Sequence, residues 1–317
     1  MSSEFTRITQ IEALLRRSHS SAVMLGIGDD CAVLSPSPLP RVWTVDSAVE
    51  GVHFTRAFME LEDIAYRAFM AAASDVAAMG GRAVAALSAL ALPASMSDEE
   101  LRRLVRGLAR AADECHCPIV GGNLTRASEL SLTMTVLGEC PSRVLSRSGA
   151  KIGDGIFVTG TVGGAALGLR LLQRGLPSER TFEPIIQRFL APRARVDVAL
   201  AVAELAHAAI DISDGLVQDL THLCRASGVG ACIHAPALPL LEELAEAARS
   251  IWLDPVALAL EGGEDYELLF TAPRERVPSG LARCIGSVVH DSEQVRVLDA
   301  QGRALSIGNG FDHFADS

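Results

Sequence analysis

The chain has 317 residues, of which 49% are apolar and 4% aromatic, and its formal net charge is −11. This length allows two domains whose cores are packed mainly from Ala, Val, Leu and Ile. The negative charge argues against a protein that grips nucleic acid by its phosphates, and it equally disfavours an anionic membrane surface.

Periodicity predicts alternating helices and strands in the first half of the chain. Residues 1–17 are amphipathic at helical spacing, and 61–79 form a helix that ends at Gly80-Gly81, because glycine is a common helix C-cap. Ser97 and Glu100 form a capping box that starts the next helix. Apolar runs between turns predict strands at 23–27, 31–34, 41–46, 83–92, 118–120 and 130–137.

The apolar pattern lapses in the segment 141–153, and we place a domain boundary there, which gives domains 1–142 and 143–317. Beyond it, the pattern predicts one helix that ends at Arg174 and two further helices at 193–207 and 214–225. It also predicts strands at 156–159, 209–212, 229–233, 268–272 and 294–298. This order indicates an α/β or α+β fold with mixed sheets.

The sequence lacks the marks of secretion and of several common site types. No signal peptide is visible, and the longest apolar run, Ala83–Ala94, is too short to span a bilayer, so we expect a cytoplasmic protein. The seven cysteines are scattered and are expected to be reduced. The only lysine, Lys151, follows Ala150 and fits neither a P-loop nor a protein-kinase strand. Metal ions, arginines and backbone amides would therefore have to bind any nucleotide phosphates.

Carboxylates recur at strand ends and turns, beside Gly, Ser or Thr. The five clusters are Gly28-Asp29-Asp30, Thr44-Val45-Asp46-Ser47, Ser74-Asp75, Asp211-Ile212-Ser213-Asp214-Gly215 and Gly262-Gly263-Glu264-Asp265. Such placement suits Mg²⁺, a hard cation that takes one or two carboxylates together with substrate phosphates and water. Small neighbouring residues let a metal and a phosphate approach the backbone.

Each cluster taken alone also has an ordinary interpretation. An aspartate beside glycine is usually a turn or N-cap residue, so Asp29 could be a turn residue that faces water and Asp214 could cap the following helix. Asp75 has apolar or small neighbours within its helix, which predicts a partly buried carboxylate in need of a partner. That partner could be a cation or an arginine such as Arg67. Spacing alone does not show that the clusters converge.

The glycine-rich turn Gly160-Thr-Val-Gly-Gly164 precedes a predicted helix and fits two interpretations. It could bind phosphate at the helix N-terminus, or it could be an ordinary strand-to-helix turn.

Taken in chain order, these segments resemble thiamine-monophosphate kinases, a branch of the superfamily of aminoimidazole-ribonucleotide synthetase. Val-Glu-Gly-Val-His-Phe at 49–54 and Gly-Gly-Glu-Asp-Tyr-Glu-Leu at 262–268 are similar to the thiamine branch in particular. The segments that carry the resemblance cover nearly the whole chain and are 26–33, 44–54, 74–81, 121–126, 147–154, 211–216, 262–270 and 310–314.

The resemblance implies a two-domain fold like that of aminoimidazole-ribonucleotide synthetase. It further implies a homodimer in which the N-terminal sheets, from the ATP- and magnesium-binding domain, join into a barrel. The C-terminal domain would complete the active site. The implied reaction is direct transfer of the γ-phosphoryl group of ATP to thiamine monophosphate, assisted by several Mg²⁺ ions.

The resemblance also implies roles for individual residues. The implied metal ligands are Asp30, Thr44, Asp46, Asp75, Asp211 and Asp214. Asp29 is added because it belongs to the same acidic turn as Asp30, and Asn123 because it follows the glycine pair that aligns with the family. The implied ATP contacts are Gly122, Asn123, Arg147 and Ser213. The implied substrate contacts are His53, Glu264 and a C-terminal aromatic residue, Phe311 or Phe314.

Two other functions stay open beside the kinase. One is another ATP-using enzyme of the same superfamily, of the type that cyclises a purine precursor. The other is a nucleotide-binding protein without turnover. Formation of thiamine diphosphate from ATP, Mg²⁺ and thiamine monophosphate separates the kinase from both.

Asn123 departs from the family pattern, which usually has Gly-Gly-Asp where this chain has Gly121-Gly122-Asn123. Asparagine keeps an oxygen donor but loses the negative charge, so we expect activity at a higher Mg²⁺ requirement. Asn123→Asp should lower the Mg²⁺ concentration that gives half-maximal rate. An unchanged magnesium dependence in the variant would show that this interpretation is wrong.

Overall fold

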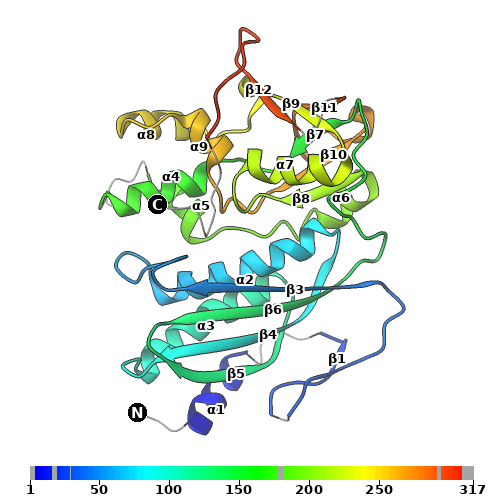
Figure 1. The fold of residues 1–317 in the computed structure, drawn as a ribbon. Coiled ribbons are helices and arrows are strands. Elements are labelled where there is room, and N and C mark those ends of the chain that lie inside the picture. The colour runs from blue at the N-terminus through cyan, green and yellow to red at the C-terminus, as the bar shows by residue number, and fades with distance from the viewer. Residues whose placement is uncertain (1–3, 16–19, 29, 177–181, 291–293, 309–317) are drawn as a thin grey trace. The chain divides into compact units, whose positions relative to one another are not determined.

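A computed structural model describes residues 4–15, 20–28, 30–176, 182–290 and 294–308 (Figure 1). The chain divides into unit 1, residues 1–76 and 81–141, and unit 2, residues 77–80 and 142–317. Among the described helices, none has the length and hydropathy needed to cross a bilayer.

Unit 1 is built on a four-stranded sheet whose strands lie in the order β3 (Arg41–Val49), β6 (Ser131–Glu139), β4 (Arg82–Pro93) and β5 (Ile119–Ala127). Strand β6 pairs antiparallel with β3 and β4, whereas β4 and β5 are parallel. A parallel pair needs a crossover, and α3 (Asp98–Glu114) lies between these two strands in the chain. A separate hairpin pairs β1 (Val23–Leu25) with β2 (Val33–Leu34).

Helix α2 (Leu61–Ala78) covers one face of this sheet (Figure 1). Gly138 of β6 lies so close to α2 that a Cβ there would be 2.4 Å from the Val76 side chain. Helix α1 (Glu4–Leu15) is tied to the start of α3 by an ion pair between Arg7 and Asp98 at 3.0 Å. The described helices therefore leave the other face of the sheet uncovered, and Trp43 on that face is 65% exposed.

Unit 2 is built on a six-stranded sheet. Its strand order is β12 (Val295–Leu298), β9 (Gly230–His234), β11 (Arg283–Val289), β7 (Gly155–Val158), β10 (Leu268–Ala272) and β8 (Ala208–Asp211). Neighbouring strands are antiparallel except for the parallel pair β12 and β9. Its helices are α4 (Gly164–Gln173), α5 (Glu183–Leu190), α6 (Ala199–Leu205), α7 (Leu216–Ser227), α8 (Leu244–Ser250) and α9 (Pro255–Glu261), with short 3₁₀ turns η1 (Ala235–Ala237) and η2 (Arg274–Arg276).

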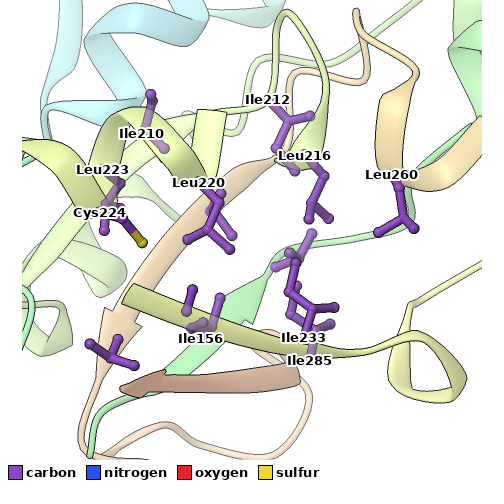
Figure 2. Close-up of a cluster of buried hydrophobic side chains, with 14 of the residues drawn as sticks. Ile156, Ile210, Ile212, Leu216, Leu220, Leu223, Cys224, Ile233, Leu260 and Ile285 are labelled. Carbon is purple, nitrogen blue, oxygen red and sulfur yellow. The ribbon is translucent and has the colours of Figure 1, made fainter. Parts of the chain in front are cut away.

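Apolar layers lie on both faces of this sheet. On one face, Leu216 and Leu220 of α7 pack with Ile156, Ile233 and Ile285 of the strands (Figure 2). On the other face, residues of α6 pack on the stacked rings of Phe157 and Phe270, whose centroids are 5.4 Å apart. Strands covered on both sides read as continuous apolar runs, which explains why β7, β8 and β10 are buried at every position.

The two-domain mixed α/β fold is confirmed, and so are several local signals. Helix α2 ends as expected, with Gly80 in the left-handed region at φ +72°. The capping box is present, because Ser97 accepts from the amide of Glu100 and donates its own amide to the Glu100 carboxylate at 2.7 Å. No sheet of the described residues closes on itself, so the barrel across two copies stays a prediction.

Other boundaries were predicted wrongly. The helix predicted at 193–207 spans only Ala199–Leu205, and Arg195, which precedes it, forms an ion pair with buried Glu267 at 3.4 Å. Strand β5 continues past Gly122, where a Cβ would lie 1.9 Å from the carbonyl oxygen of Ser88, so the glycine admits the neighbouring backbone. Among the described α-helices and strands, those without a sequence prediction are α5, α8, α9 and β11, which span only seven or eight residues each.

Gly107 marks the close crossing of α3 over α2, because a Cβ there would lie 2.0 Å from the carbonyl oxygen of Glu62. Gly107→Ala should therefore destabilise the protein by about 1–3 kcal/mol, as overpacking does. Without the clash, alanine would stabilise the helix by about 1 kcal/mol. Urea unfolding measures the sign of the change in the free energy of unfolding. A variant as stable as the wild type would contradict the close crossing of the two helices at Gly107.

Candidate active site

In unit 1, strand β3 and helix α2 bring three predicted metal ligands to one face of the sheet. Thr44 and Asp46 alternate with outward-facing Trp43 and Val45, so both point toward the helix layer. Thr44 Oγ1 donates a hydrogen bond to the carboxylate of Asp75, which is half-buried in α2 as its sequence context predicted. Thr44 and Asp75 are therefore adjacent, and Asp46 lies about 7 Å further along the strand.

The other predicted residues of unit 1 are more dispersed. Asp30 is exposed in the loop between β1 and β2. Asn123 lies on β5, at the opposite edge of the sheet from β3, which is about 14 Å away across three strand spacings. Gly122 and Asn123 are thus not brought next to Thr44 or Asp46 within one copy of unit 1.

His53 lies in the turn that follows β3. The amide of Val49 donates to His53 Nδ1 at 3.1 Å, so Nδ1 carries no proton in this arrangement and the neutral ring has its proton on Nε2. The turn leaves His53 half-buried.

In unit 2, strand β8 ends at Asp211, and the loop that leads from it to α7 carries Ser213 and Asp214. Asp219, in the first turns of α7, accepts hydrogen bonds from the backbone amides of Ser213 at 3.0 Å and Asp214 at 3.2 Å. Burial and the neighbouring Asp211 and Asp214 carboxylates raise the pKa of Asp219 to about 8. Asp219 was not predicted from the sequence. The available signal was a carboxylate between Leu216, Leu220 and other apolar residues on the buried side of the helix.

A second loop, residues 262–267, lies directly against the first. The amide of Glu264 donates to the carbonyl oxygen of Ser213 at 2.8 Å, and the amide of Tyr266 donates to that of Ile212 at 2.9 Å. At Gly263 a Cβ would lie 2.3 Å from the carbonyl oxygen of Ser213, so this close approach requires glycine. The predicted substrate residue Glu264 and the predicted nucleotide residue Ser213 are therefore brought together.

Glu264 and Tyr266 both adopt left-handed backbone conformations, with φ of 67° and 52°. Such conformations are uncommon outside glycine and cluster at functional sites. The alternating residues Asp265 and Glu267 point into the core, where they are 7% and 2% exposed. The buried pair therefore anchors the segment that presents Glu264.

Asp265 holds the glycine-rich turn before α4. Its carboxylate accepts the amides of Gly163 at 2.6 Å and Ala165 at 3.1 Å, so a carboxylate of the same chain occupies the helix N-terminus. Of the two interpretations of this turn, the structure supports the ordinary strand-to-helix turn. Glu267 accepts from Thr159 Oγ1 at 2.7 Å and pairs with Arg188 at 3.1 Å.

Arg147 is exposed and lies beside β8. The carbonyl oxygen of its neighbour Ser146 accepts the amide of Ala209 at 3.0 Å, and Ser227 Oγ donates to the carbonyl oxygen of Arg147 at 3.0 Å. The backbone at Arg147 is thus fixed next to the strand that ends at Asp211. Asp29, Phe311 and Phe314 lie outside the described residues.

The donor chemistry of the acidic loops fits magnesium, although their geometry alone does not form a complete site. In the part of the chain that the structure describes, no three His, Cys, Asp or Glu side chains stand together as a metal-binding group. Mg²⁺ does not need three, because it keeps waters and is usually bound by one or two carboxylates plus substrate phosphates. The oxygens of Asp46, Asp75, Asp211 and Asp214 belong to the type that it prefers.

The chain belongs to the AIR synthase related protein family. The family's N-terminal domain matches residues 28–140, and its C-terminal domain matches residues 151–297. The thiamine-monophosphate kinase of Aquifex aeolicus (strain VF5) is 38% identical over 267 residues, which cover 83% of this chain and 85% of the relative. That of Escherichia coli (strain K12) is 37% identical over 313 residues, 94% of each chain.

Solved structures agree with this relationship. AaThiL complexed with AMPPCP and TMP is 36% identical, with a TM-score of 0.82 over 98% of this chain and 97% of that one. Thiamine-monophosphate kinase from Stenotrophomonas maltophilia K279a is 34% identical, with a TM-score of 0.83 over 96% and 98% of the two chains. Within the family, the chain groups with the thiamine-monophosphate kinases, which are phosphotransferases.

The buried carboxyl of Asp265 predicts a pH-dependent stability. Burial raises its pKa from 3.8 to about 7, although two backbone amides and Arg188 act in the opposite direction. Between pH 4 and 7 the folded state keeps a proton that the unfolded state has lost, so this group makes stability fall as pH rises. Asp265→Asn removes that dependence but leaves one backbone amide without an acceptor. The stability of the variant relative to the wild type should therefore be lowest near pH 4 and rise by about 2–4 kcal/mol toward pH 7.

Urea unfolding at several pH values between 4 and 8 measures this difference. A gap between wild type and variant that stays constant with pH would contradict the burial of a titrating carboxyl at this position.

Proposed function

We propose that the protein catalyses ATP-dependent phosphorylation of thiamine monophosphate to thiamine diphosphate, with assistance from Mg²⁺. The similarity to a thiamine-monophosphate kinase at 37% identity over 94% of both chains carries this proposal. The similar structure of AaThiL in complex with AMPPCP and TMP supports the pair of substrates.

The reaction is a direct phosphoryl transfer. A phosphate oxygen of thiamine monophosphate bonds to the γ-phosphorus of ATP as the bond from that phosphorus to the β–γ bridging oxygen breaks, and ADP leaves with the electron pair. The attacking oxygen is already anionic, so the chain needs no strong general base, and positioning and electrostatics supply most of the rate. We accordingly assign no residue as a catalytic acid or base.

The acidic loops would serve to assemble charge. Both substrates are polyanions, and Mg²⁺ when bound would neutralise their phosphates and align them for in-line displacement. A chain with net charge −11 can then bind phosphates, because its carboxylates first recruit cations. The oxygen donors that would hold the ions are Asp29, Asp30, Thr44, Asp46, Asp75 and Asn123 in unit 1, and Asp211 and Asp214 in unit 2.

The remaining residues would position the substrates. The exposed guanidinium of Arg147 can bind a phosphate through two parallel hydrogen bonds, with the backbone of Gly122 and Ser213 near the nucleotide. Glu264 would face the positively charged thiazolium ring, and His53, whose Nδ1 accepts the amide of Val49, would contact the substrate. Phe311 or Phe314 would add an aromatic contact.

A product assay with matched variants tests the kinase proposal. The wild type should form thiamine diphosphate from ATP, Mg²⁺ and thiamine monophosphate, measured by chromatography. Asp75→Asn in unit 1 and Asp214→Asn in unit 2 should each lower kcat on the order of a hundredfold, because each removes negative charge that would hold Mg²⁺ against the transferring phosphate. Asp254→Asn, at the N-cap of α9, is the control and should keep its rate.

ATP binding without formation of the diphosphate would contradict the kinase and favour a protein without turnover. Release of ADP with a purine precursor in place of thiamine monophosphate would favour the other enzyme type.

We also propose that a second copy of the chain covers the open face of the unit 1 sheet, as the homodimer of the family implies. On that face Trp43 and Val45 are each 65% exposed and Leu87 is 39% exposed. Neighbouring large apolar side chains in water are typical of interaction surfaces. The adjoining polar residues, such as Thr133 and Thr135, are short enough to be covered as well.

Light scattering after gel filtration should give a mass near twice 33.5 kDa for the wild type. Trp43→Glu should shift the protein to the monomer, because it places a charge in the interface. Trp252→Glu is the matched control, since Trp252 in unit 2 is 93% exposed and should tolerate the change. A dimer that persists in Trp43→Glu would contradict the placement of the interface.

A further inference from the structure

Asp219 lies in α7, which follows the acidic loop of unit 2 directly (Figure 1). Its side chain is almost fully buried at 2% exposure, so it has no surface to offer to a substrate. The side chain nevertheless ends at the loop, where its Oδ2 atom accepts the amides of Ser213 and Asp214. Any effect of Asp219 on the reaction must therefore act through the backbone of the loop.

The loop is held from two sides. On the side of α7, the carboxylate of Asp219 accepts amides of the loop, and its own amide donates to the carbonyl oxygen of Gly215 at 2.9 Å. On the other side, the carbonyl oxygens of Ile212 and Ser213 accept amides from residues 266 and 264. The peptide groups between Ile212 and Asp214 thus have partners in both directions, which fixes their orientation.

This fixation matters because acidic groups gather at this loop: the charges of Asp211 and Asp214 lie close enough to Asp219 to help raise its pKa. Nearby charges of one sign favour any backbone rotation that separates them, so a fixed backbone is needed to keep Asp211 and Asp214 in one arrangement. A carboxylate that orients ligands without touching the metal is a common support of metal sites, and its loss typically lowers metal affinity about 10–100-fold.

We infer that Asp219 is a positioning residue, whose bonds to the amides of Ser213 and Asp214 hold Asp211 and Asp214 in the arrangement that binds divalent cations. The inference rests on the proposed function, because it names a support for the same site. It assigns the role to the acceptor oxygen of Asp219. Its negative charge is not required.

Two substitutions separate these features. Asp219→Ala removes the acceptor and leaves two amides without their partner. Asp219→Asn keeps one acceptor oxygen and removes the charge. Asp254→Ala is the control, because Asp254 also accepts a backbone amide, from Val256 at 2.9 Å, at the start of another helix of unit 2.

The affinity for Mn²⁺ in the presence of ATP, measured by calorimetry on the full chain, requires no turnover. Asp219→Ala should weaken it by at least about tenfold, and Asp219→Asn should stay closer to the wild type. Asp254→Ala should lower the unfolding midpoint without a change in affinity. In the kinase assay, the Mg²⁺ concentration for half-maximal rate should rise in Asp219→Ala, and urea unfolding establishes that the variants are folded.

Asp219→Ala with wild-type cation affinity and only a lower unfolding midpoint would overturn the inference, as would a wild type that binds no Mn²⁺. If Asp219→Ala does not fold, the Mn²⁺ affinity of Asp219→Asn decides the question. An affinity as low as that of Asp214→Asn would show that Asp219 acts through its charge and not by positioning the loop through its acceptor oxygen. A wild type that binds Mn²⁺ but forms no thiamine diphosphate would contradict the proposed function alone.

Discussion

Backbone hydrogen bonds between two loops hold three acidic side chains close together in unit 2. The loop after β8 would not keep Asp211 and Asp214 near Asp219 by itself, because burial and neighbouring charge disfavour ionised groups there, as the raised pKa of Asp219 reflects. The amides of residues 264 and 266 fix the loop from one side, and Asp219 fixes it from the other. A negative site built in this way gains from binding cations, and through them phosphates.

Close packing of backbones makes this arrangement possible. At Gly215 a Cβ would lie 2.7 Å from the carbonyl oxygen of Glu261, at the end of α9, and at Gly263 it would lie 2.3 Å from that of Ser213. The two glycines therefore admit a backbone contact that side chains would prevent. Behind the loops, Asp265 and Glu267 tie the second segment to the N-terminus of α4 and to Arg188, which leaves Glu264 little freedom. In unit 1, the hydrogen bond from Thr44 of strand β3 to Asp75 of helix α2 holds a predicted metal ligand in place in a simpler way.

Local features were predictable from the sequence, since neighbouring residues determine them. The capping box of Ser97 and the half-buried position of Asp75 follow from spacing and are confirmed. The role of Asp265 was not predictable, because it bonds to Gly163, 102 residues away in the chain. Asp219 was missed for a related reason, since an acidic residue among leucines of a helix gives no sign of the loop that it contacts. The idea that aspartates of both units meet around the same phosphates stays a prediction.

The most direct measurement is anomalous scattering from crystals grown with Mn²⁺, a non-hydrolysable ATP analogue and thiamine monophosphate. The account predicts Mn²⁺ peaks in contact with phosphate oxygens and with carboxylates from each unit, including Asp75 and Asp214. Phosphates bound to the protein without a metal ion near any of these carboxylates would contradict it.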